Sequence, residues 1–383
     1  MTKLSLVLTI AVIAAAGALL ATGLHRSVQV QSPSTRVASL YAQFKAKFGR
    51  LQATPAEDQF RLRVFEKNLA LIDEVNKHKL GYSFAVNDFA DMEKDEFAAK
   101  YYGLGSWKGD DFWNVFSGDS DDDEEGEDEE EEDEDEEKDE EEEEENAETE
   151  QTQDEPVKES TKTEDADQAD KVDWSSDMHP IQQQHACASC YAFSAVVPLE
   201  LAYLKTHGTK LRLAPQELVD CSAEFGNTGC KGGWMHQAYD YILDKGHLSL
   251  ESGYPYMAVE AQACRLNNQK IGSLLKSYKV LKKHRQSDIR SHLRNTVVPS
   301  AVDCSGLMFY RDGVYDGQCD SNINHAVVIV GFGTNDDGQK YWKVRNSWGT
   351  NWGEDGYLRI KREESNGKHG KCGITSYNVV TLQ

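Results

Sequence analysis

Two cysteines three positions apart, Cys187 and Cys190, are the side chains with the clearest potential for chemistry. An apolar run follows at once, from Tyr191 to Leu204, and predicts a buried helix that begins close to the second cysteine. In the first turn of a helix, unpaired backbone N–H groups and the positive end of the helix dipole favour a thiolate over a thiol. Cys190 is therefore a candidate nucleophile, while a zinc half-site, a redox pair and two structural sulfurs remain alternatives for this spacing.

Two later stretches favour the nucleophile. Asn324 and His325 open an apolar run, Ala326 to Val330, which predicts a strand with an imidazole at its end. Asn346 and Trp348 follow in a short polar stretch. A thiol, an imidazole and an amide are the groups that cysteine nucleophiles use, because the imidazole exchanges the thiol's proton and the amide orients the imidazole.

Together with Gln184, these motifs resemble the signature of the papain-like cysteine proteases, the cathepsin L branch in particular, and stand in that family's order. Each residue alone is equally well explained as core, turn or surface, so the joint occurrence carries the interpretation. The resemblance implies a cysteine endopeptidase that forms a thioester acyl-enzyme, with Cys190 attacking as a thiolate paired with a charged His325. It also implies that Asn346 orients the imidazole, that Trp348 shields that contact, and that Gln184 helps to stabilise the oxyanion.

The resemblance further implies a substrate cleft. The glycine-rich turn Gly229–Gly233 is expected to let the substrate backbone approach closely. The expected cleft residues are Gly232, Gly233, Trp234, Met235, Ala301, Ile323, Ala326, Tyr377 and Trp348. Because the main pocket is apolar and Tyr377 shortens its floor, we expect a preference for Leu, Val or a smaller aromatic residue at the second position before the scissile bond.

All eight cysteines lie between Cys187 and Cys372, and a secretory context favours disulfides, although spacing alone permits many pairings. The resemblance implies three pairs: Cys187 with Cys230, Cys221 with Cys264, and Cys319 with Cys372. Cys190 then stays a free thiol. Cys304 is left over, either as a small buried hydrophobe or as a regulatory or intermolecular thiol.

The N-terminal region predicts a targeting signal and a helical segment. An uncharged apolar run from Leu4 to Ala21 predicts a signal peptide over residues 1–23, with an uncleaved membrane anchor as the alternative. Between Leu40 and Lys79, apolar residues at helical spacing predict one or two amphipathic helices. Their expected apolar positions are Phe60, Val64, Leu69 and Ile72.

Two motifs in this region resemble those of cathepsin L-type inhibitory prosegments. Their residues are Glu57, Arg61, Phe65, Asn68, Ile72 and Asn76, followed by Asn87, Phe89 and Asp91, with Ala85 where that family usually has glycine. The resemblance implies a zymogen in which residues 24–108 form a helical inhibitory prosegment. That segment would run through the protease cleft in a non-cleavable direction until acid loosens it.

One stretch has no counterpart in that family. Asp119 to Glu150 holds 26 acidic residues and one lysine, whereas the rest of the chain balances at 40 acidic and 40 basic residues. Such a block repels itself and cannot bury apolar surface, so residues 109–168 are predicted to be an acidic disordered linker. It is either a solvated spacer discarded with the prosegment or an element that tunes activation or sorting.

The predicted fold is α+β, a papain-like protease over residues 169–383 preceded by the helical prosegment. The helix after Cys190 and a second helical pattern, Met235 to Asp244, fill its first half. The second half is rich in predicted strands, and the site is expected in the cleft between the halves. These strands are Val297–Val302, Ala326–Val330, Tyr341–Val344 and Tyr357–Ile360.

Four positions depart from the family pattern. His185 and Ala188 stand where glycine is usual, and Tyr191 stands where tryptophan is usual. Pro198 lies inside the predicted helix, where it removes a hydrogen bond and is expected to kink the helix at a cost of about 3 kcal/mol. These departures bear on rate and specificity more than on reaction type.

The expected partners are protein and peptide substrates and the chain's own prosegment. No cofactor, metal ion, nucleic acid or, after signal cleavage, membrane is expected, and the protein is expected to be a monomer. The expected location is the secretory pathway, leading to a lysosome-like or food-vacuole-like acidic compartment or to secretion. The alternative function is a weak or inactive protease homologue that acts in storage or binding through its acidic tract.

Overall fold

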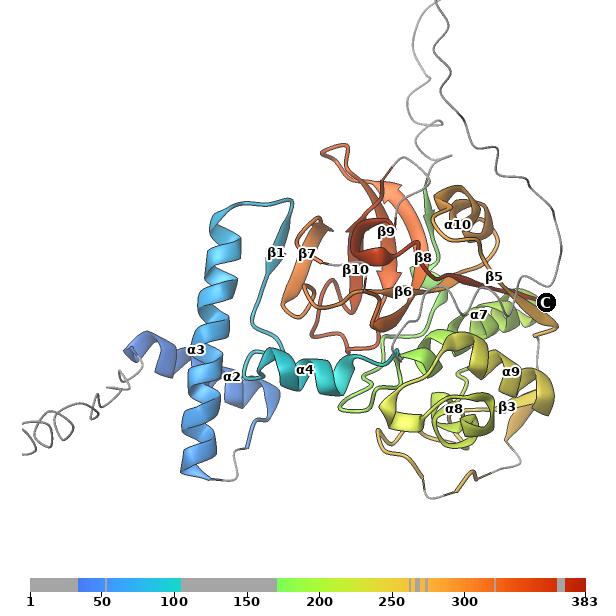
Figure 1. Cartoon of the computed structure of the whole chain (residues 1–383), viewed down its shortest axis with the longest axis horizontal. Coiled ribbons are helices and arrows are strands. Elements are labelled where there is room, and N and C mark those ends of the chain that lie inside the picture. The colour runs from blue at the N-terminus through green and yellow to red at the C-terminus, as the bar shows by residue number, and fades with distance from the viewer. Residues whose placement is uncertain are drawn as a thin grey trace, which may run out of the picture. The chain divides into compact units, whose positions relative to one another are not determined.

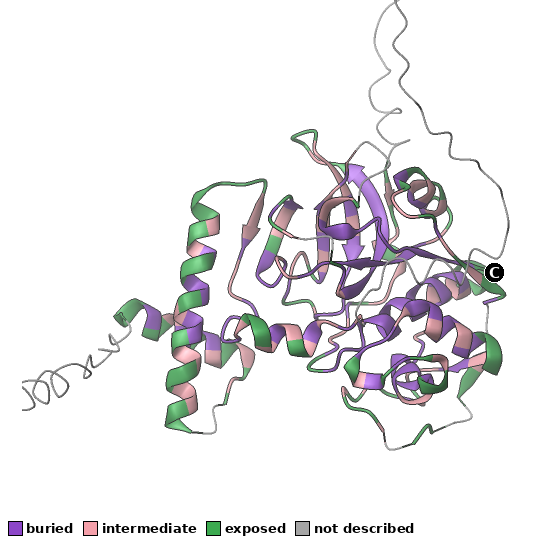
Figure 2. Cartoon of the chain, viewed as in Figure 1, coloured by how far each residue is buried: buried purple, intermediate pink, exposed green. Residues whose placement is uncertain are grey.

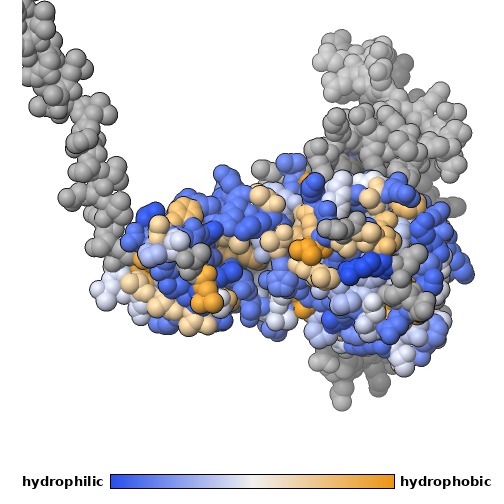
Figure 3. All heavy atoms as spheres, turned by 90° about the horizontal axis from the view of Figure 1, so that it is seen from below, coloured by the Kyte–Doolittle hydropathy of each residue, from blue (hydrophilic) through white to orange (hydrophobic). Residues whose placement is uncertain are grey.

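The computed structural model describes residues 34–51, 54–104, 171–261, 263–265, 269–272, 275–319, 322–363 and 369–383. The predicted signal peptide and acidic linker lie outside these residues. The chain divides into two compact units, residues 1–70 and 71–383. On the face shown in Figure 3, the described surface is mostly hydrophilic, with small separate hydrophobic patches.

The first unit contains helix α2 (Thr35–Phe48) and most of helix α3 (Pro55–Lys77). The Ser34 hydroxyl accepts a hydrogen bond from Val37 N and caps α2. Between the helices, Phe65 lies with its ring centroid 5.4 Å from that of Tyr41. The predicted helical spacing is present, and Val64, Leu69 and Ile72 are buried, whereas Phe60 is not. Phe60 is 38% exposed, with the Arg61 guanidinium over its ring at 5.5 Å.

The second unit begins with the end of α3, strand β1 (Tyr82–Phe84) and helix α4 (Lys94–Tyr101). Asn76 joins α3 to β1, because its side-chain amide both donates to Phe84 O and accepts from Phe84 N, each at 2.9 Å. Strand β1 then pairs antiparallel with β7 (Tyr310–Tyr315) of the predicted protease. Asn87 adds a further contact by donating to Met308 O at 2.8 Å.

The first half of the predicted protease is helical and surrounds α7 (Cys190–His207), with α8 (Pro215–Cys221) and α9 (Met235–Lys245) beside it (Figure 1). Helix α7 runs unbroken through Pro198. Most of α7 is buried, so tertiary packing supports a helix that proline alone would weaken. Shorter elements complete this half: η1 (Ser175–Asp177), η2 (Ala223–Phe225), η3 (Gly229–Lys231), β3 (His247–Ser249) and β4 (Lys270–Gly272).

The second half is built on a sheet in the order β1-β7-β10-β9-β8-β2, with β6 also paired to β8. Strand β8 is buried at every position but its last (Figure 2). All four predicted strands are present, and the predicted α+β fold is confirmed. The bounds are β2 (Val172–Asp173), β6 (Val298–Val302), β8 (His325–Thr334), β9 (Lys340–Arg345) and β10 (Tyr357–Lys361), with β5 (Ser277–Val280), α10 (Gln286–Leu293), η4 (Lys371–Gly373) and β11 (Val379–Leu382) around the sheet.

Three disulfides brace the second unit: Cys187–Cys230, Cys221–Cys264 and Cys319–Cys372. These are the same three pairs that the resemblance implied. Cys190 and Cys304 are free and buried.

Replacing Asn76 with alanine tests the junction between α3 and β1. The variant leaves the Phe84 backbone without two partners, so we expect the full-length protein to lose about 1–3 kcal/mol of stability, measured by thermal unfolding. Lys77→Ala is the matched control, because Lys77 forms only an exposed ion pair with Glu74, and such pairs contribute little. Equal unfolding temperatures for the two variants would show that the Asn76 contacts do not stabilise the junction.

Candidate active site

Cys190 is the first residue of α7, and its side chain is completely buried. Its sulfur accepts a hydrogen bond from Ala326 N at 3.3 Å, which brings the first residue of the helix against the start of β8. Burial raises the pKa of the Cys190 thiol to about 12, although backbone N–H groups including those of Ala326 and Tyr191 act in the opposite direction. In this covered state desolvation outweighs the N-terminal helix environment, so the thiol keeps its proton.

His325 opens β8 and is also completely buried. Its Nε2–H donates to Asn346 Oδ1 at 2.8 Å, and the Trp348 ring lies 4.7 Å from the imidazole, centroid to centroid. Burial lowers the pKa of His325 to about 4, while two oxygen atoms at its ring nitrogens, Asn346 Oδ1 and Tyr101 O, favour the protonated ring and act in the opposite direction. Thiol and imidazole are thus both neutral near pH 7, and among the described residues no hydrogen bond joins them.

Gln184 connects the two halves of the site. Its backbone N donates to Ser347 O at 2.8 Å, and its side-chain Oε1 accepts from the Ser347 hydroxyl at 2.6 Å. Its Nε2 donates to Cys187 O at 3.0 Å, which leaves the second hydrogen of the amide for another acceptor. The segment before α7 is therefore fixed to the Asn346–Trp348 segment that follows β9.

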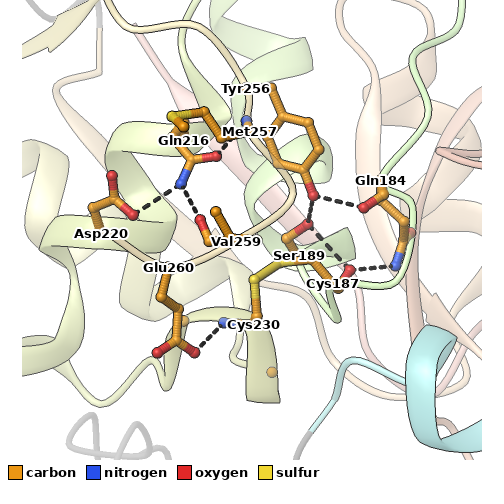
Figure 4. Close-up of a disulfide and its surroundings, with 12 residues drawn as sticks. Gln184, Cys187, Ser189, Gln216, Asp220, Cys230, Tyr256, Met257, Val259 and Glu260 are labelled. Carbon is orange, nitrogen blue, oxygen red and sulfur yellow. Dashed lines mark hydrogen bonds between the residues drawn. A yellow bond between two sulfur atoms is a disulfide. The ribbon is translucent and has the colours of Figure 1, made fainter. Parts of the chain in front are cut away.

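Figure 4 shows the support behind Gln184, beside the Cys187–Cys230 disulfide. The Tyr256 hydroxyl donates to Gln184 O at 2.7 Å and lies 2.7 Å from the Ser189 hydroxyl. Sequence reasoning missed Tyr256 and Ser347. Ser347 lies within a motif that was already singled out, whereas nothing in the sequence around Tyr256 points to the site.

The segment Tyr101–Leu104 covers the thiol and imidazole. Tyr101 O lies 3.2 Å from His325 Nδ1, the ring nitrogen that Asn346 leaves available. Gly103 N donates to Asn324 O at 2.9 Å, and Gly103 O accepts from Gly233 N at 2.8 Å. The segment is therefore bound between Asn324 on one wall and Gly233 on the other.

Gly103 lies directly over the nucleophile. A Cβ atom added there would be 2.4 Å from Cys190 Sγ and 2.7 Å from Ala188 O. Gly232, which faces Gly103 O, also cannot take a side chain. Its φ is +119°, and an added Cβ would lie 2.7 Å from Gly103 O. Only backbone fits between these surfaces.

Aromatic residues anchor the covering segment. Phe89, Phe97 and Tyr101 pack edge-on against Trp348, with ring centroids 5.5, 5.2 and 6.0 Å away. Because Trp348 also lies against the His325 ring, its indole contacts both this imidazole and the segment that covers it.

The predicted specificity pocket forms one apolar cluster that includes Cys190. The cluster members from the prediction are Met235, Ala301, Ile323, Ala326 and Tyr377, with Trp234 packed against them. Leu104 of the covering segment packs against the same cluster. The Tyr377 hydroxyl lies 2.7 Å from His236 Nδ1, so a buried histidine holds this tyrosine in place.

Two of the departures from the family pattern, His185 and Ala188, differ in backbone conformation. His185 has φ +51°, a left-handed conformation that favours glycine, whereas Ala188 has no positive φ. The left-handed conformation therefore occurs at His185, an exposed residue next to Gln184, and not at Ala188. Tyr191 is buried, with its hydroxyl donating to Gly229 O at 3.2 Å.

Comparison with known families places residues 168–382 in the papain family cysteine protease model and residues 41–97 in the cathepsin propeptide inhibitor domain. The chain belongs to the papain family of cysteine proteases. The cathepsin L-like proteinase of Fasciola hepatica is 35% identical over 351 residues, covering 88% of this chain and 91% of that protein. Digestive cysteine proteinase 3 of Homarus americanus is 32% identical over 346 residues, covering 87% and 91%.

Solved precursors of papain-family proteases share the fold. A recombinant stem bromelain precursor matches with a TM-score of 0.70 and 25% identity, over 90% of this chain and 98% of that one. Digestive procathepsin L 3 from Tenebrio molitor larval midgut matches with a TM-score of 0.69 and 28% identity, over 91% and 99%. This papain-family protein is a cysteine endopeptidase made as a zymogen, and its own prosegment is its intramolecular inhibitor. Within the described part of the chain, no helix is long and apolar enough to cross a membrane.

Substituting Gly103 with alanine tests how the prosegment blocks the thiol. The added methyl group overlaps Cys190 Sγ, so we expect the covering segment to bind more weakly by about 1–3 kcal/mol and Cys190 of the intact zymogen to react roughly 10- to 100-fold faster with a thiol-directed epoxide. Gly272→Ala is the control, since an added Cβ there meets no atom within 4 Å. An unchanged labelling rate in Gly103→Ala would contradict the close contact.

Proposed function

We propose that Cys190, His325, Asn346 and Gln184 are the catalytic residues of this endopeptidase. One observation supports this proposal above all. Asn346 Oδ1 accepts from His325 Nε2, so the other ring nitrogen, Nδ1, is directed away from Asn346. In the zymogen, Tyr101 O lies against Nδ1. Once the prosegment leaves, that nitrogen is free to take the proton of Cys190. Solvent entry then favours the charged thiolate and imidazolium that burial suppresses.

The reaction follows in two displacements. The Cys190 thiolate attacks the peptide carbonyl carbon, and the displaced electron pair moves to the carbonyl oxygen, which accepts from the second Gln184 Nε2 hydrogen and from Cys190 N–H. His325 donates its Nδ1 proton to the leaving amine, and a thioester remains. Water, deprotonated by His325, then attacks the thioester and releases the carboxylic acid with the thiolate. Losing one oxyanion donor typically raises the barrier by about 3 kcal/mol.

We propose that the substrate backbone uses the groups that now hold the prosegment. Gly233 N and Asn324 O are engaged by Gly103 and Leu104 in the zymogen, and their release leaves a donor and an acceptor on opposite walls. Leu104 packs on the apolar cluster closed by Tyr377, which supports a preference for Leu or Val at the second position before the scissile bond.

We also propose that the signal peptide over residues 1–23 directs the zymogen into the secretory pathway, and that the enzyme works in an acidic compartment or after secretion. Three disulfides support this route. Maturation would remove the prosegment and acidic linker by cleavage around residues 165–171, just before β2, and leave a monomeric protease domain over residues 169–383.

Labelling of the mature enzyme tests the catalytic assignment. A thiol-directed epoxide should modify Cys190 alone, and Cys190→Ala should abolish both labelling and peptide hydrolysis, as measured by mass spectrometry and turnover of a peptide substrate. Cys304→Ala is the matched control, because it removes the other buried free thiol and should keep one label per chain. Hydrolysis by Cys190→Ala would refute the assignment, and a mature enzyme that neither reacts nor hydrolyses would favour storage or binding through the acidic tract.

Changing the pocket floor tests the specificity. Tyr377→Ala removes the side chain that His236 holds, so we expect kcat/KM for Phe at the second position before the scissile bond to rise about tenfold relative to Leu. Tyr377→Phe keeps the ring and should retain the preference for Leu. The same preference profile in wild type and Tyr377→Ala would show that Tyr377 does not close this pocket.

A further inference from the structure

One stretch of the protease domain is strongly basic. From Lys276 to Arg294 there are seven Lys or Arg residues and a single acid, Asp288, for a net charge of +6. We define the basic face as four exposed members of this stretch. They are Lys276, Lys279, Lys282 and Arg285. None of these four side chains forms an ion pair with another residue of the described structure.

Several other described cations of the protease domain are paired with an acid. Lys343 pairs with Asp173 at 2.7 Å, and Arg359 pairs with Glu354 at 2.6 Å. Lys361 likewise lies 2.7 Å from an acid. The charge imbalance is therefore concentrated in β5 and in the turn that leads into α10, which lie close together in Figure 1.

We propose that the basic face is the docking surface for the acidic tract, Asp119–Glu150, of the same chain. The tract carries a net charge of −25, and the remaining chain is balanced at 40 acidic and 40 basic residues. A surface of this chain that attracts the tract must therefore be a local excess of cations. The basic face is such an excess, and it is made of side chains that have no acid of their own.

The attachment point of the tract favours this surface. The chain re-enters the described structure at Lys171, and the next residue, Val172, pairs with Phe332 of β8. The guanidinium groups of Arg290 and Arg294, which continue the positive stretch through α10, lie 5.2 and 5.9 Å from the centre of the Phe332 ring. The linker therefore rejoins the protease domain beside the C-terminal end of the same positive stretch.

The segment that connects the acidic tract to the protease domain has a length that permits intramolecular binding. Twenty residues separate Glu150 from Lys171, and they span at most about 70 Å when fully extended. A connection of this length keeps the tract at a high effective concentration, in the millimolar range for short linkers. One exposed ion pair contributes at most about 1 kcal/mol and is screened by salt, so the interaction depends on many simultaneous pairs.

Docking has a consequence for maturation. While the tract is covalently attached, it covers the cations of the basic face. Cleavage just before β2 would detach the tract, and the mature domain would then present Lys276, Lys279, Lys282 and Arg285 to solvent. Proenzyme and mature enzyme would differ in surface charge as well as in access to the cleft.

Carbodiimide cross-linking of the full-length Cys190→Ala proenzyme, which cannot cleave itself, tests the proposal without depending on activity. This reagent joins lysine amines directly to carboxylates. We expect Lys276, Lys279 and Lys282 to form at least about fivefold more links to residues 119–150 than three exposed lysines elsewhere, with loss of this excess in 0.5 M NaCl. The comparison lysines are Lys205, Lys210 and Lys270.

Two outcomes would overturn the proposal. Links spread evenly over all exposed lysines would show that the tract has no preferred surface. Links found only between isotopically distinct chains in a mixed sample would show that the tract reaches another molecule.

A second measurement uses a synthetic peptide of residues 119–150 and mature enzyme blocked with a thiol epoxide. Replacing all four residues of the basic face with Glu should weaken peptide binding at least about tenfold in low salt. Glu at Lys205, Lys210 and Lys270 should weaken it far less. Equal losses in the two variants would mean that only overall charge matters, and the proposal would be rejected.

Discussion

Desolvation of the Cys190 and His325 side chains by residues 101–104 is the constraint on which the zymogen depends. Both side chains are completely buried, and burial moves both pKa values toward the neutral forms, to about 12 for the thiol and about 4 for the imidazole. In the proposed mechanism, the same two groups must be charged to attack a peptide bond. Inhibition is therefore electrostatic as well as steric: the segment that fills the cleft also removes the water that an ion pair needs.

This arrangement also determines how the catalytic pair responds to pH. In the covered state, Cys190 carries its proton and His325 is neutral between about pH 4 and 12. After opening, transfer of that proton from sulfur to nitrogen forms the ion pair without any net uptake from solvent. By linkage, opening at this pair has no pH dependence at those pH values where the opened pair keeps both of its charges. The acid loosening that the resemblance implies would therefore come from other groups, such as carboxylates that lose charge toward pH 4.

Much of the fold and site could be predicted from sequence because the signals are local. Cys190, His325 and Asn346 stand at the starts or ends of strongly apolar elements, and periodicity located α7, α9 and four strands. Contacts between distant segments left no such signal: the Tyr256 support for Gln184, the exposure of Phe60 and the positive φ of His185 all arise from tertiary packing. The sequence likewise predicted the helix N-terminus at Cys190 but not the burial of its thiol under Gly103.

The ionisation of His325 is the most direct test of this account. Cys190→Ser keeps the zymogen intact and replaces the thiol with a group that does not ionise, so that only the imidazole titrates. NMR titration of the His325 ring should give a pKa of about 4 in this proenzyme and a pKa near the ordinary histidine value of about 6.5 after the prosegment is removed. Because covering lowers the pKa of His325, the covered form of this variant should lose stability relative to the open form as pH falls from about 6.5 to about 4. The same pKa before and after removal would contradict the claim that the prosegment silences the site by desolvation.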